Sequence, residues 1–481
     1  MNFRMIGYII CWVLKIEGAF MVLPCIISLI YREWDELVVY LICMAVIIAI
    51  GFAGTAKKPG NQEIYMKDGF VAVALCWVVM SLFGAIPFVL TGEIPSYLDA
   101  VFEIVSGFTT TGATILPDVE ALSHTSLLWR SFSHWIGGMG VLVFILMLMP
   151  TRSGLSMNLM RAESPGPEVS KFVPRVRNTA ILLYKIYIGM TLAEIAALLI
   201  SGMHWFDTAC ISMGTAGTGG FGVLNSSCAD YTPAQQWIIT VFMILFGVSF
   251  TLYYLIIKKK LKMAFQALEL RVYIILIAAS TVFITINVLS FYSSGAETVR
   301  HAAFQVGSII STTGFSTTDF NLWPQFSKMI LLILMFSGAC AGSTGGGIKV
   351  SRLIILFKSI KSEINGITHP RIVKNLTVDG RVLDNAQIRT TRIYLAAYTA
   401  IVLGSLLVIS FDGFSFETNF SAVAATLNNI GPGFDMVGPL GTYAAFGAVS
   451  KIVLIFNMIA GRLELFPVLL LFFPATWNRK V

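Results

Sequence analysis

Long apolar runs dominate the chain and predict membrane-spanning helices. The first two cover about residues 5–30 and 36–55, with the short polar turn 31–36 between them. An apolar run of about 18 residues or more is long enough to cross the hydrocarbon core of a bilayer as a helix. The N-terminal run is too long for a cleavable signal and lacks a clear cleavage site. The pattern predicts an all-α, polytopic membrane protein.

One unit recurs four times after these two runs. Each unit has a long apolar run, a shorter and less hydrophobic segment ending in Thr, Gly or Asn, and a second long run. A polar residue starts each short segment 13 residues before a glycine, in the pairs Asp99 and Gly112, Asp207 and Gly220, His301 and Gly314, and Thr418 and Gly431. This internal repeat predicts two N-terminal helices in 1–66 and four pore units in 67–152, 175–260, 268–362 and 388–481.

The short segments are too short to cross a membrane. About ten helical residues span roughly 15 Å, whereas the hydrocarbon core is about 30 Å thick. Such a segment enters the membrane, stops and returns as non-helical backbone, which is tolerated only where protein buries it or where it lines a water-filled cavity. Four copies predict four re-entrant loops around one pore. The alternative is a set of Gly/Thr-rich loops that only pack helices together.

Composition and charge exclude several classes of protein. Hydrophobic residues make up 56% of the 481 residues and charged residues only 12%, against about 25% charged in a soluble domain. We therefore expect no soluble enzyme. No C-x-x-C pair and no ligand spacing among the five histidines is present, so we expect no structural metal and no cofactor.

The distribution of basic residues predicts the orientation. Of the 33 basic residues, 23 lie in the loops between units and near the C-terminus, and the opposite face is assigned Arg32, Arg130, Arg300 and Lys328. By the positive-inside rule, both termini and the inter-unit loops are cytoplasmic, and the short helices enter from outside. The net charge of +7 then reflects the cytoplasmic loops, so we expect the lipid membrane and not nucleic acid as a partner.

Backbone chemistry explains why a glycine recurs at the same position in all four copies. A helix entering from outside points the negative end of its dipole at the membrane centre, where it favours a cation. Asp99 and Asp207 suit the N-cap positions at the other end. Beyond each helix, carbonyls must turn inward to replace a cation's water shell, and glycine permits the torsions this requires. No acidic residue stands at the four glycines, so the pattern favours K⁺ before Na⁺.

The motifs TTTGAT, TGGFG, STTGFST and NNIGPG resemble the four selectivity-filter segments of the Trk/Ktr/HKT potassium-transporter superfamily. The two additional N-terminal helices and the length resemble its bacterial TrkH/TrkG branch. The resemblance implies a K⁺-binding filter formed by Thr110, Thr111, Gly112, Ala113, Thr218, Gly219, Gly220, Phe221, Thr312, Thr313, Gly314, Phe315, Asn429, Ile430 and Gly431. The walls are not equivalent, because Gly219 and Ile430 stand where the first and third copies have Thr.

The resemblance also implies a location and partners. It implies potassium uptake across the bacterial cytoplasmic (inner) membrane by a homodimer. A cytosolic, nucleotide-binding (RCK-type) regulatory subunit is implied too, and the polar loops, especially 358–392, offer it a docking surface. The sequence itself leaves a proton- or sodium-coupled K⁺ symporter as the alternative to a channel-like pore. Only Glu194 and Glu464 are predicted as membrane-embedded carboxylates, which argues mildly against such a relay.

A glycine-rich stretch, residues 338–347, interrupts the second run of the third unit. Each glycine costs a helix about 1 kcal/mol relative to alanine, so we expect a loop under the filter, which the resemblance makes a gate; a close-packed helix surface is the alternative. Arg462 lies mid-run, where charge is expensive, and is predicted to hold the gate or to pair with Glu464. Lys349 belongs to the gate or reaches the cytoplasmic surface. The predicted gate residues are Gly338, Gly342, Gly345, Gly346, Gly347, Lys349 and Arg462.

Overall fold

The computed structural model describes residues 1–61, 63–140, 176–369, 376–379 and 381–477. Within these ranges six helices are long and apolar enough to cross a membrane, and a seventh span is added if one pair of helices bent by 91° is counted as one. The regular secondary structure of the described residues is helical, apart from a two-stranded antiparallel pairing of β1 (Thr377–Val378) with β2 (Arg381–Val382). The predicted all-α membrane fold is confirmed.

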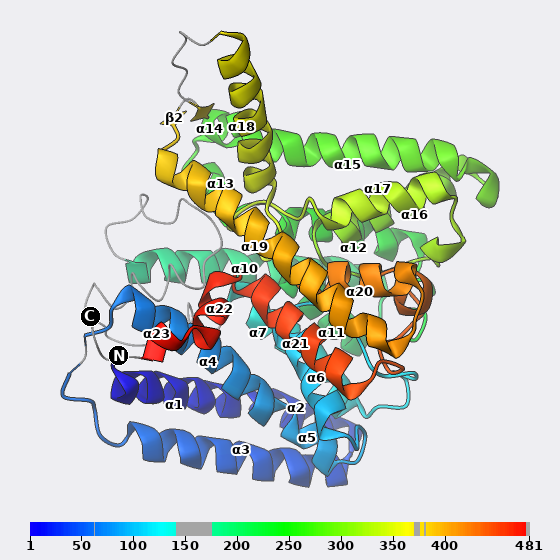
Figure 1. The fold of residues 1–481 in the computed structure, drawn as a ribbon. Coiled ribbons are helices and arrows are strands. Elements are labelled where there is room, and N and C mark those ends of the chain that lie inside the picture. The colour runs from blue at the N-terminus through cyan, green and yellow to red at the C-terminus, as the bar shows by residue number, and fades with distance from the viewer. Residues whose placement is uncertain (62, 141–175, 370–375, 380, 478–481) are drawn as a thin grey trace.

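The N-terminal region forms two spans beside the rest of the bundle (Figure 1). Helices α1 (Phe3–Phe20) and α2 (Val22–Tyr31) form one 29-residue span, and α3 (Trp34–Thr55) packs back against it. The ring of Phe3 stacks on that of Trp477, with the centroids 6.3 Å apart. Both ends of the described chain therefore lie on the same side of the molecule.

The remaining helices form four units of the same design. The first contains α4 (Met66–Gly84), α5 (Ile86–Leu90), α6 (Tyr97–Phe108) and α7 (His124–Met139). The second contains α10 (Val176–Ile200), α11 (Trp205–Gly217), α12 (Pro233–Phe246) and α13 (Phe250–Ile257), and α14 (Leu261–Gln266) connects it to the third. The third contains α15 (Leu268–Asn287), η1 (Leu289–Phe291), α16 (Gly295–Ile310), η2 (Phe320–Leu322), α17 (Gln325–Met335) and α18 (Val350–Thr368). The fourth contains α19 (Asn385–Ile409), η3 (Ser410–Asp412), α20 (Phe416–Leu427), η4 (Asp435–Val437), α21 (Ala448–Arg462), α22 (Phe466–Phe472) and α23 (Pro474–Trp477).

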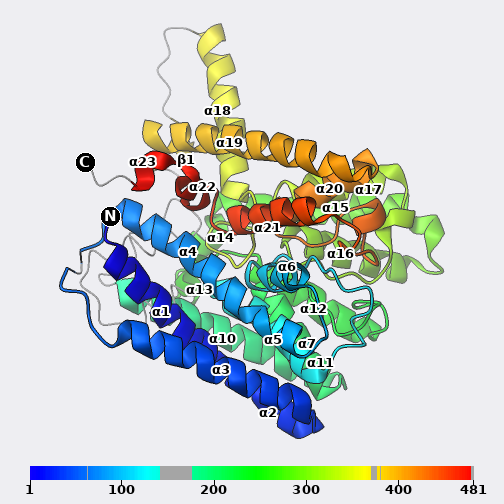
Figure 2. The ribbon, with the colours of Figure 1, turned by 60° about the horizontal axis from the view of Figure 1, so that its bottom comes forward.

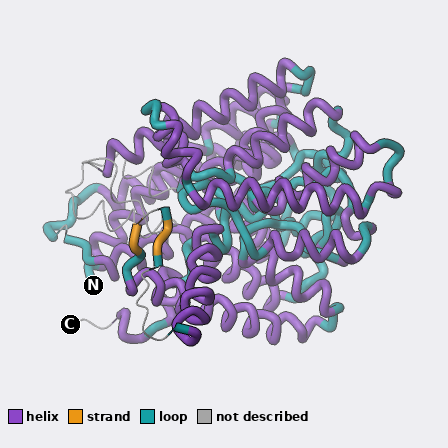
Figure 3. Tube along the Cα trace, turned by 90° about the horizontal axis from the view of Figure 1, so that it is seen from above, coloured by secondary structure: helices purple, strands orange, loops and turns teal. Residues whose placement is uncertain are grey.

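The four units close into a ring. The short helices α6, α11, α16 and α20 are the pore helices, and the inner helices α7, α12, α17 and α21 follow them. Each pore helix contacts its own inner helix and also the inner helix of the preceding unit: α11 contacts α7, α16 contacts α12, α20 contacts α17, and α6 contacts α21. Viewed from above, loops gather at the centre of the molecule and helices surround them (Figure 3).

The inner helices are short or broken. They contain 16, 14, 11 and 15 residues in unit order. The chain bends by 91° between α12 and α13, residues 336–349 between α17 and α18 are non-helical, and α21 ends three residues before α22. Helix α18 projects from the bundle (Figures 1 and 2). The end of the first predicted unit, 141–152, and part of the predicted docking surface, 370–375, lie outside the described residues.

The starts of the pore helices correct two details of the sequence prediction. Asp99 and Asp207 are not N-caps: the caps are Ser96, whose hydroxyl accepts a hydrogen bond from the Asp99 N–H, and His204. Both aspartates lie at the third helical position, where a carboxylate still favours the positive end of the helix dipole. The third pore helix begins at Gly295 and not at His301, because Ser294 caps it.

Candidate functional site

All four pore helices end in the same backbone motif. A residue with φ of 54–62° follows each helix: Thr110, Thr218, Thr312 and Asn429. Its N–H donates to the carbonyl three residues earlier, and the next N–H donates to the carbonyl five residues earlier at 2.8–2.9 Å. This is the Schellman termination, whose left-handed position is usually glycine. Placing Thr there costs about 1–2 kcal/mol, whereas Asn tolerates this conformation better.

The four glycines that the sequence predicts in the filter, called the filter glycines below, bring the four copies into contact. Gly112, Gly220, Gly314 and Gly431 all have φ between 77° and 96°. A Cβ on Gly112 would lie 2.0 Å from the Gly219 carbonyl oxygen, and one on Gly220 would lie 2.1 Å from that of Thr313. In the same way Gly314 faces the Ile430 carbonyl at 2.0 Å, and Gly431 faces that of Thr111 at 2.6 Å. The contacts close a ring, and each carbonyl belongs to the residue just before a filter glycine.

The electrostatics of this ring favour a cation. Each pore helix carries an acidic residue in its first turn and no basic residue in its last turn. The negative ends of four helix dipoles therefore lie beside the ring without a compensating cationic side chain of their own. Carbonyl oxygens in such a ring can replace the water shell of a dehydrated monovalent cation.

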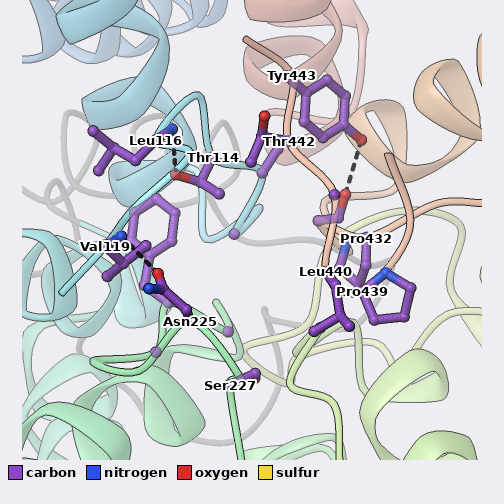
Figure 4. A pocket seen from close by; sticks show the side chains of 18 of the residues that line it. Thr114, Leu116, Val119, Asn225, Ser227, Pro432, Pro439, Leu440, Thr442 and Tyr443 are labelled. Atoms are coloured by element: carbon purple, nitrogen blue, oxygen red, sulfur yellow. Dashed lines mark hydrogen bonds between the residues drawn. The ribbon is translucent and has the colours of Figure 1, made fainter. Parts of the chain in front are cut away.

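A cavity of about 130 Å³ lies beside the ring, and its lining includes all four of these glycines. Figure 4 looks into it, with Tyr443 and Asn225 on different walls. The Tyr443 hydroxyl donates to the Gly431 carbonyl at 2.8 Å, and the Asn225 side chain accepts from the Val119 N–H at 2.8 Å. The Tyr443 bond holds the fourth loop on itself, and the Asn225 bond joins loops of the first and second units.

The glycine-rich stretch is a loop that packs directly against the ends of the third and fourth pore helices. The Gly346 N–H donates to the Thr312 hydroxyl at 2.8 Å. A Cβ on Gly346 would lie 2.6 Å from that of Asn429, and one on Gly345 would lie 3.0 Å from the Ser311 carbonyl. Gly338, Gly342 and Gly347 have φ values of 48°, 74° and 61°. Only glycine fits these positions without strain or collision.

Two basic side chains hold this loop. Lys349 is buried, with 2% of its surface exposed, and donates to the carbonyls of Gly345 and Gly346, so it does not reach the cytoplasmic surface. Arg462 donates to the Thr344 carbonyl of the loop at 2.6 Å and to the carbonyls of Gly137 and Gly138 in α7. Arg462 thus joins three units across the axis below the filter.

Glu464, the predicted alternative partner of Arg462, pairs with another residue. Glu464 accepts a hydrogen bond from Arg352, whose guanidinium lies 4.0 Å from the centre of the Tyr394 ring. No pairing of Glu464 with Arg462 occurs among the described contacts. Glu269, at the start of α15, accepts from the N–H groups of Ala341 and Ser351 at 2.7 and 3.0 Å and so anchors both ends of the loop.

Comparison with known proteins identifies the family. A family model described as TrkH, cation transport protein, matches residues 38–479. The chain belongs to the TrkH family. This confirms the resemblance seen in the four filter motifs, and the family is one of transport proteins and not of enzymes.

Relatives of the chain match it over almost its whole length. The Trk system potassium uptake protein TrkH of Escherichia coli (strain K12) is 36% identical over 99% of this chain and 100% of its own. TrkG of the same strain is 32% identical over 99% and 98%. The crystal structure of the potassium transporter TrkH from Vibrio parahaemolyticus superposes with a TM-score of 0.89 at 31% identity, covering 99% of this chain and 100% of that one.

The structure of this TrkH-family chain reveals buried carboxylates that the sequence prediction missed. Besides Glu194, both Glu17 and Glu103 are buried, with 2% and 0% exposed, so the prediction that only Glu194 and Glu464 are embedded was wrong. Glu103 pairs with Arg130 at 2.7 Å. Arg130, which was assigned to the face opposite the basic loops, is itself 2% exposed and lines the cavity beside the ring. A charged residue inside the short apolar segment, Glu103, was the available signal.

Proposed function

We propose that this chain takes up potassium through a pore whose selectivity filter is the ring of four carbonyls described above. The names of the relatives, potassium uptake proteins and a potassium transporter, support K⁺ as the transported ion. The observation that carries the proposal is the closed contact of the four glycines with the carbonyls of Thr111, Gly219, Thr313 and Ile430. A ring of uncharged oxygens suits K⁺, whose hydration shell is less costly to remove than that of a divalent ion.

The gate is the second part of the proposal. The loop 338–347 lies against the filter, and Lys349 and Arg462 place positive charge on the inner side of the cation path. A cation leaving the filter would meet this charge and the loop backbone. Conduction therefore requires that the Arg462 bonds to the loop break and that the loop move aside.

Partners and orientation follow as proposals of the same kind. The positive-inside rule places the basic loops, the chain ends and α18 in the cytoplasm. Helix α18 exposes apolar side chains there: Phe357 is 67% exposed and Ile367 80%. Exposed apolar residues on one helix favour a protein contact, which supports a homodimer and a cytosolic, nucleotide-binding (RCK-type) subunit that controls the gate.

One observation favours a coupled symporter as the second candidate. Glu17 and Glu194 are buried, and neither forms an ion pair with any residue that the structure describes. Carboxylates at membrane depth are the groups that proton relays in transporters use, so a coupled mechanism is chemically available. The carbonyl ring itself needs no coupling ion, which is why we favour the pore.

The experiment that tests the proposal is cation flux into liposomes containing the purified protein alone. K⁺ and Na⁺ are compared under one imposed diffusion potential, with and without a pH gradient. We expect flux that prefers K⁺ and follows its electrochemical gradient. Equal K⁺ and Na⁺ flux would refute the carbonyl filter, and flux that appears only with a proton or sodium gradient would replace the pore with the symporter.

A further inference from the structure

The second filter copy lacks a side chain that two other copies have. Thr111 and Thr313 stand immediately before their filter glycines, whereas the second copy has Gly219. The space is not empty. A Cβ on Gly219 would lie 2.2 Å from Cγ and 2.3 Å from Nδ1 of His134. The imidazole of His134, from α7 of the first unit, therefore occupies the place where the missing threonine would be.

The two threonines show what such a side chain does in the other copies. The Thr313 hydroxyl bonds to that of Ser311 at 2.6 Å. The Thr111 hydroxyl bonds to that of Thr109 at 2.8 Å and accepts from the Asn429 side chain at 2.9 Å. Each threonine thus fixes the filter backbone from behind through its hydroxyl.

His134 bonds to the second filter copy from a neighbouring unit, through backbone groups and not through hydroxyls. Its Nε2 accepts the Phe221 N–H of the second filter at 3.2 Å, and its Nδ1 lies 2.7 Å from the Gly107 carbonyl of the first pore helix. A carbonyl only accepts hydrogen bonds, so Nδ1 carries the hydrogen and the ring is the neutral tautomer. The ring is completely buried, and its centroid lies 4.2 Å from that of Phe221.

A buried ion pair fixes the same helix. Arg130 lies one turn before His134 on α7, a spacing that puts both side chains on one face. Its guanidinium lies 4.1 Å from the centre of the Phe221 ring and bonds to Glu103. Glu103 also accepts the Ile115 N–H at 2.9 Å, on the non-helical segment that leaves the first filter. Phe221 is thus held between two side chains of the first unit.

We propose that His134 is a positioning residue that determines ion preference: it supplies to the second filter copy, from the first unit, the support that threonine supplies in the first and third copies. This inference rests on the proposed filter function. It explains why Gly219 is glycine although its own φ is not in the left-handed region: the reason is the neighbouring imidazole and not the backbone torsion.

The first test separates the two hydrogen bonds of the imidazole. In His134→Asn the amide nitrogen can replace Nδ1 toward Gly107, but nothing reaches the Phe221 N–H. In His134→Gln the longer side chain still offers an acceptor there. We expect the K⁺/Na⁺ flux ratio in liposomes to fall about tenfold in His134→Asn, the equivalent of one unsatisfied buried donor, and to stay nearer the wild-type ratio in His134→Gln. Equal ratios in the wild type and both variants would overturn the proposal.

The second test moves the threonine into its own copy. Gly219→Thr alone should collide with His134 and lose K⁺ preference, His134→Ala alone should also lose it, and the combination should regain it. If Gly219→Thr does not fold, the comparison of His134→Ala with the double variant still decides, because neither contains the collision. A double variant no more selective than His134→Ala would overturn the proposal.

The results separate a failure of the proposed role of His134 from a failure of the proposed filter function. A wild-type protein without K⁺ preference refutes the proposed filter. A wild type that prefers K⁺, with a preference that none of the His134 or Gly219 variants changes, refutes only the role of His134. Thr313→Gly is the matched control, because it removes a threonine from the third filter copy, which has its own support. Adding His134→Ala to Thr313→Gly should therefore not restore K⁺ preference.

Discussion

Replacing Gly220 by alanine tests the carbonyl ring most directly. The added methyl group would lie 2.1 Å from the Thr313 carbonyl oxygen and 3.0 Å from the carbonyl carbons of Thr313 and Gly314. These atoms are backbone of the next filter copy and are not the ends of flexible side chains. The substitution therefore acts on the ring itself.

The expected free-energy cost of Gly220→Ala to the filter geometry follows from two effects. Alanine at a φ of 77° costs about 1–2 kcal/mol because its Cβ crowds the following carbonyl. The Thr313 carbonyl must also move by roughly 1 Å to reach ordinary contact, and overpacking of this kind costs about 1–3 kcal/mol. Together the filter geometry is disfavoured by about 2–5 kcal/mol, enough to displace one of four ligands from the ion.

The assay is K⁺ and Na⁺ flux in liposomes, with Gly222→Ala as the matched control. Gly222 lies two residues further along the same loop, and the nearest atom to a Cβ there is 3.4 Å away. We expect Gly220→Ala to lower the K⁺/Na⁺ ratio at least tenfold, the equivalent of about 1.4 kcal/mol, and Gly222→Ala to leave it unchanged. Wild-type preference and rate in Gly220→Ala would refute the assignment of this glycine to a cation-binding ring.

Three further predictions concern the gate, the buried pair and the outer surface. Arg462→Gln weakens the link from α21 to the loop at Thr344, so K⁺ flux should rise several-fold at an unchanged K⁺/Na⁺ ratio; lower flux would contradict the gate. Arg130→Met leaves Glu103 buried without its cation and should cost about 3–5 kcal/mol, seen as a lower thermal midpoint, and adding Glu103→Gln should recover much of it; no recovery would contradict a role for the pair. Burial raises the pKa of Glu33, but hydrogen bonds from Thr125 and His124 outweigh this effect and hold that pKa below its ordinary 4.5. The ionised Glu33 carboxylate therefore stabilises the fold fully above pH 4.5, and this contribution is lost as pH falls through the lowered pKa. Glu33→Gln should thus lower the thermal midpoint at pH 7, by a gap that narrows as pH falls below 4.5; a gap independent of pH would contradict this.

Much of this protein was determined by the sequence alone. Apolar length specifies membrane spans, because an uncharged run of sufficient length is stable as a helix in lipid. The fixed distance from a polar residue to one glycine in each unit placed the four re-entrant loops in a common register. Those features are local, since each depends on the residues within one segment and on the torsions that glycine allows. For the same reason the family could be identified from four short motifs.

The tertiary structure decided which segments meet. The cyclic order of the units and the contact of each glycine with the next copy depend on how helices pack and not on any one segment. Arg462 finds backbone carbonyls of two other units and leaves Glu464 to Arg352. The clearest case is Gly219, which looked like a defect in one wall of the filter. Its partner, His134, comes from another unit and precedes by 87 positions the Phe221 whose N–H it accepts. No local pattern can predict that a side chain so distant fills the space, because only the packed bundle brings the two together.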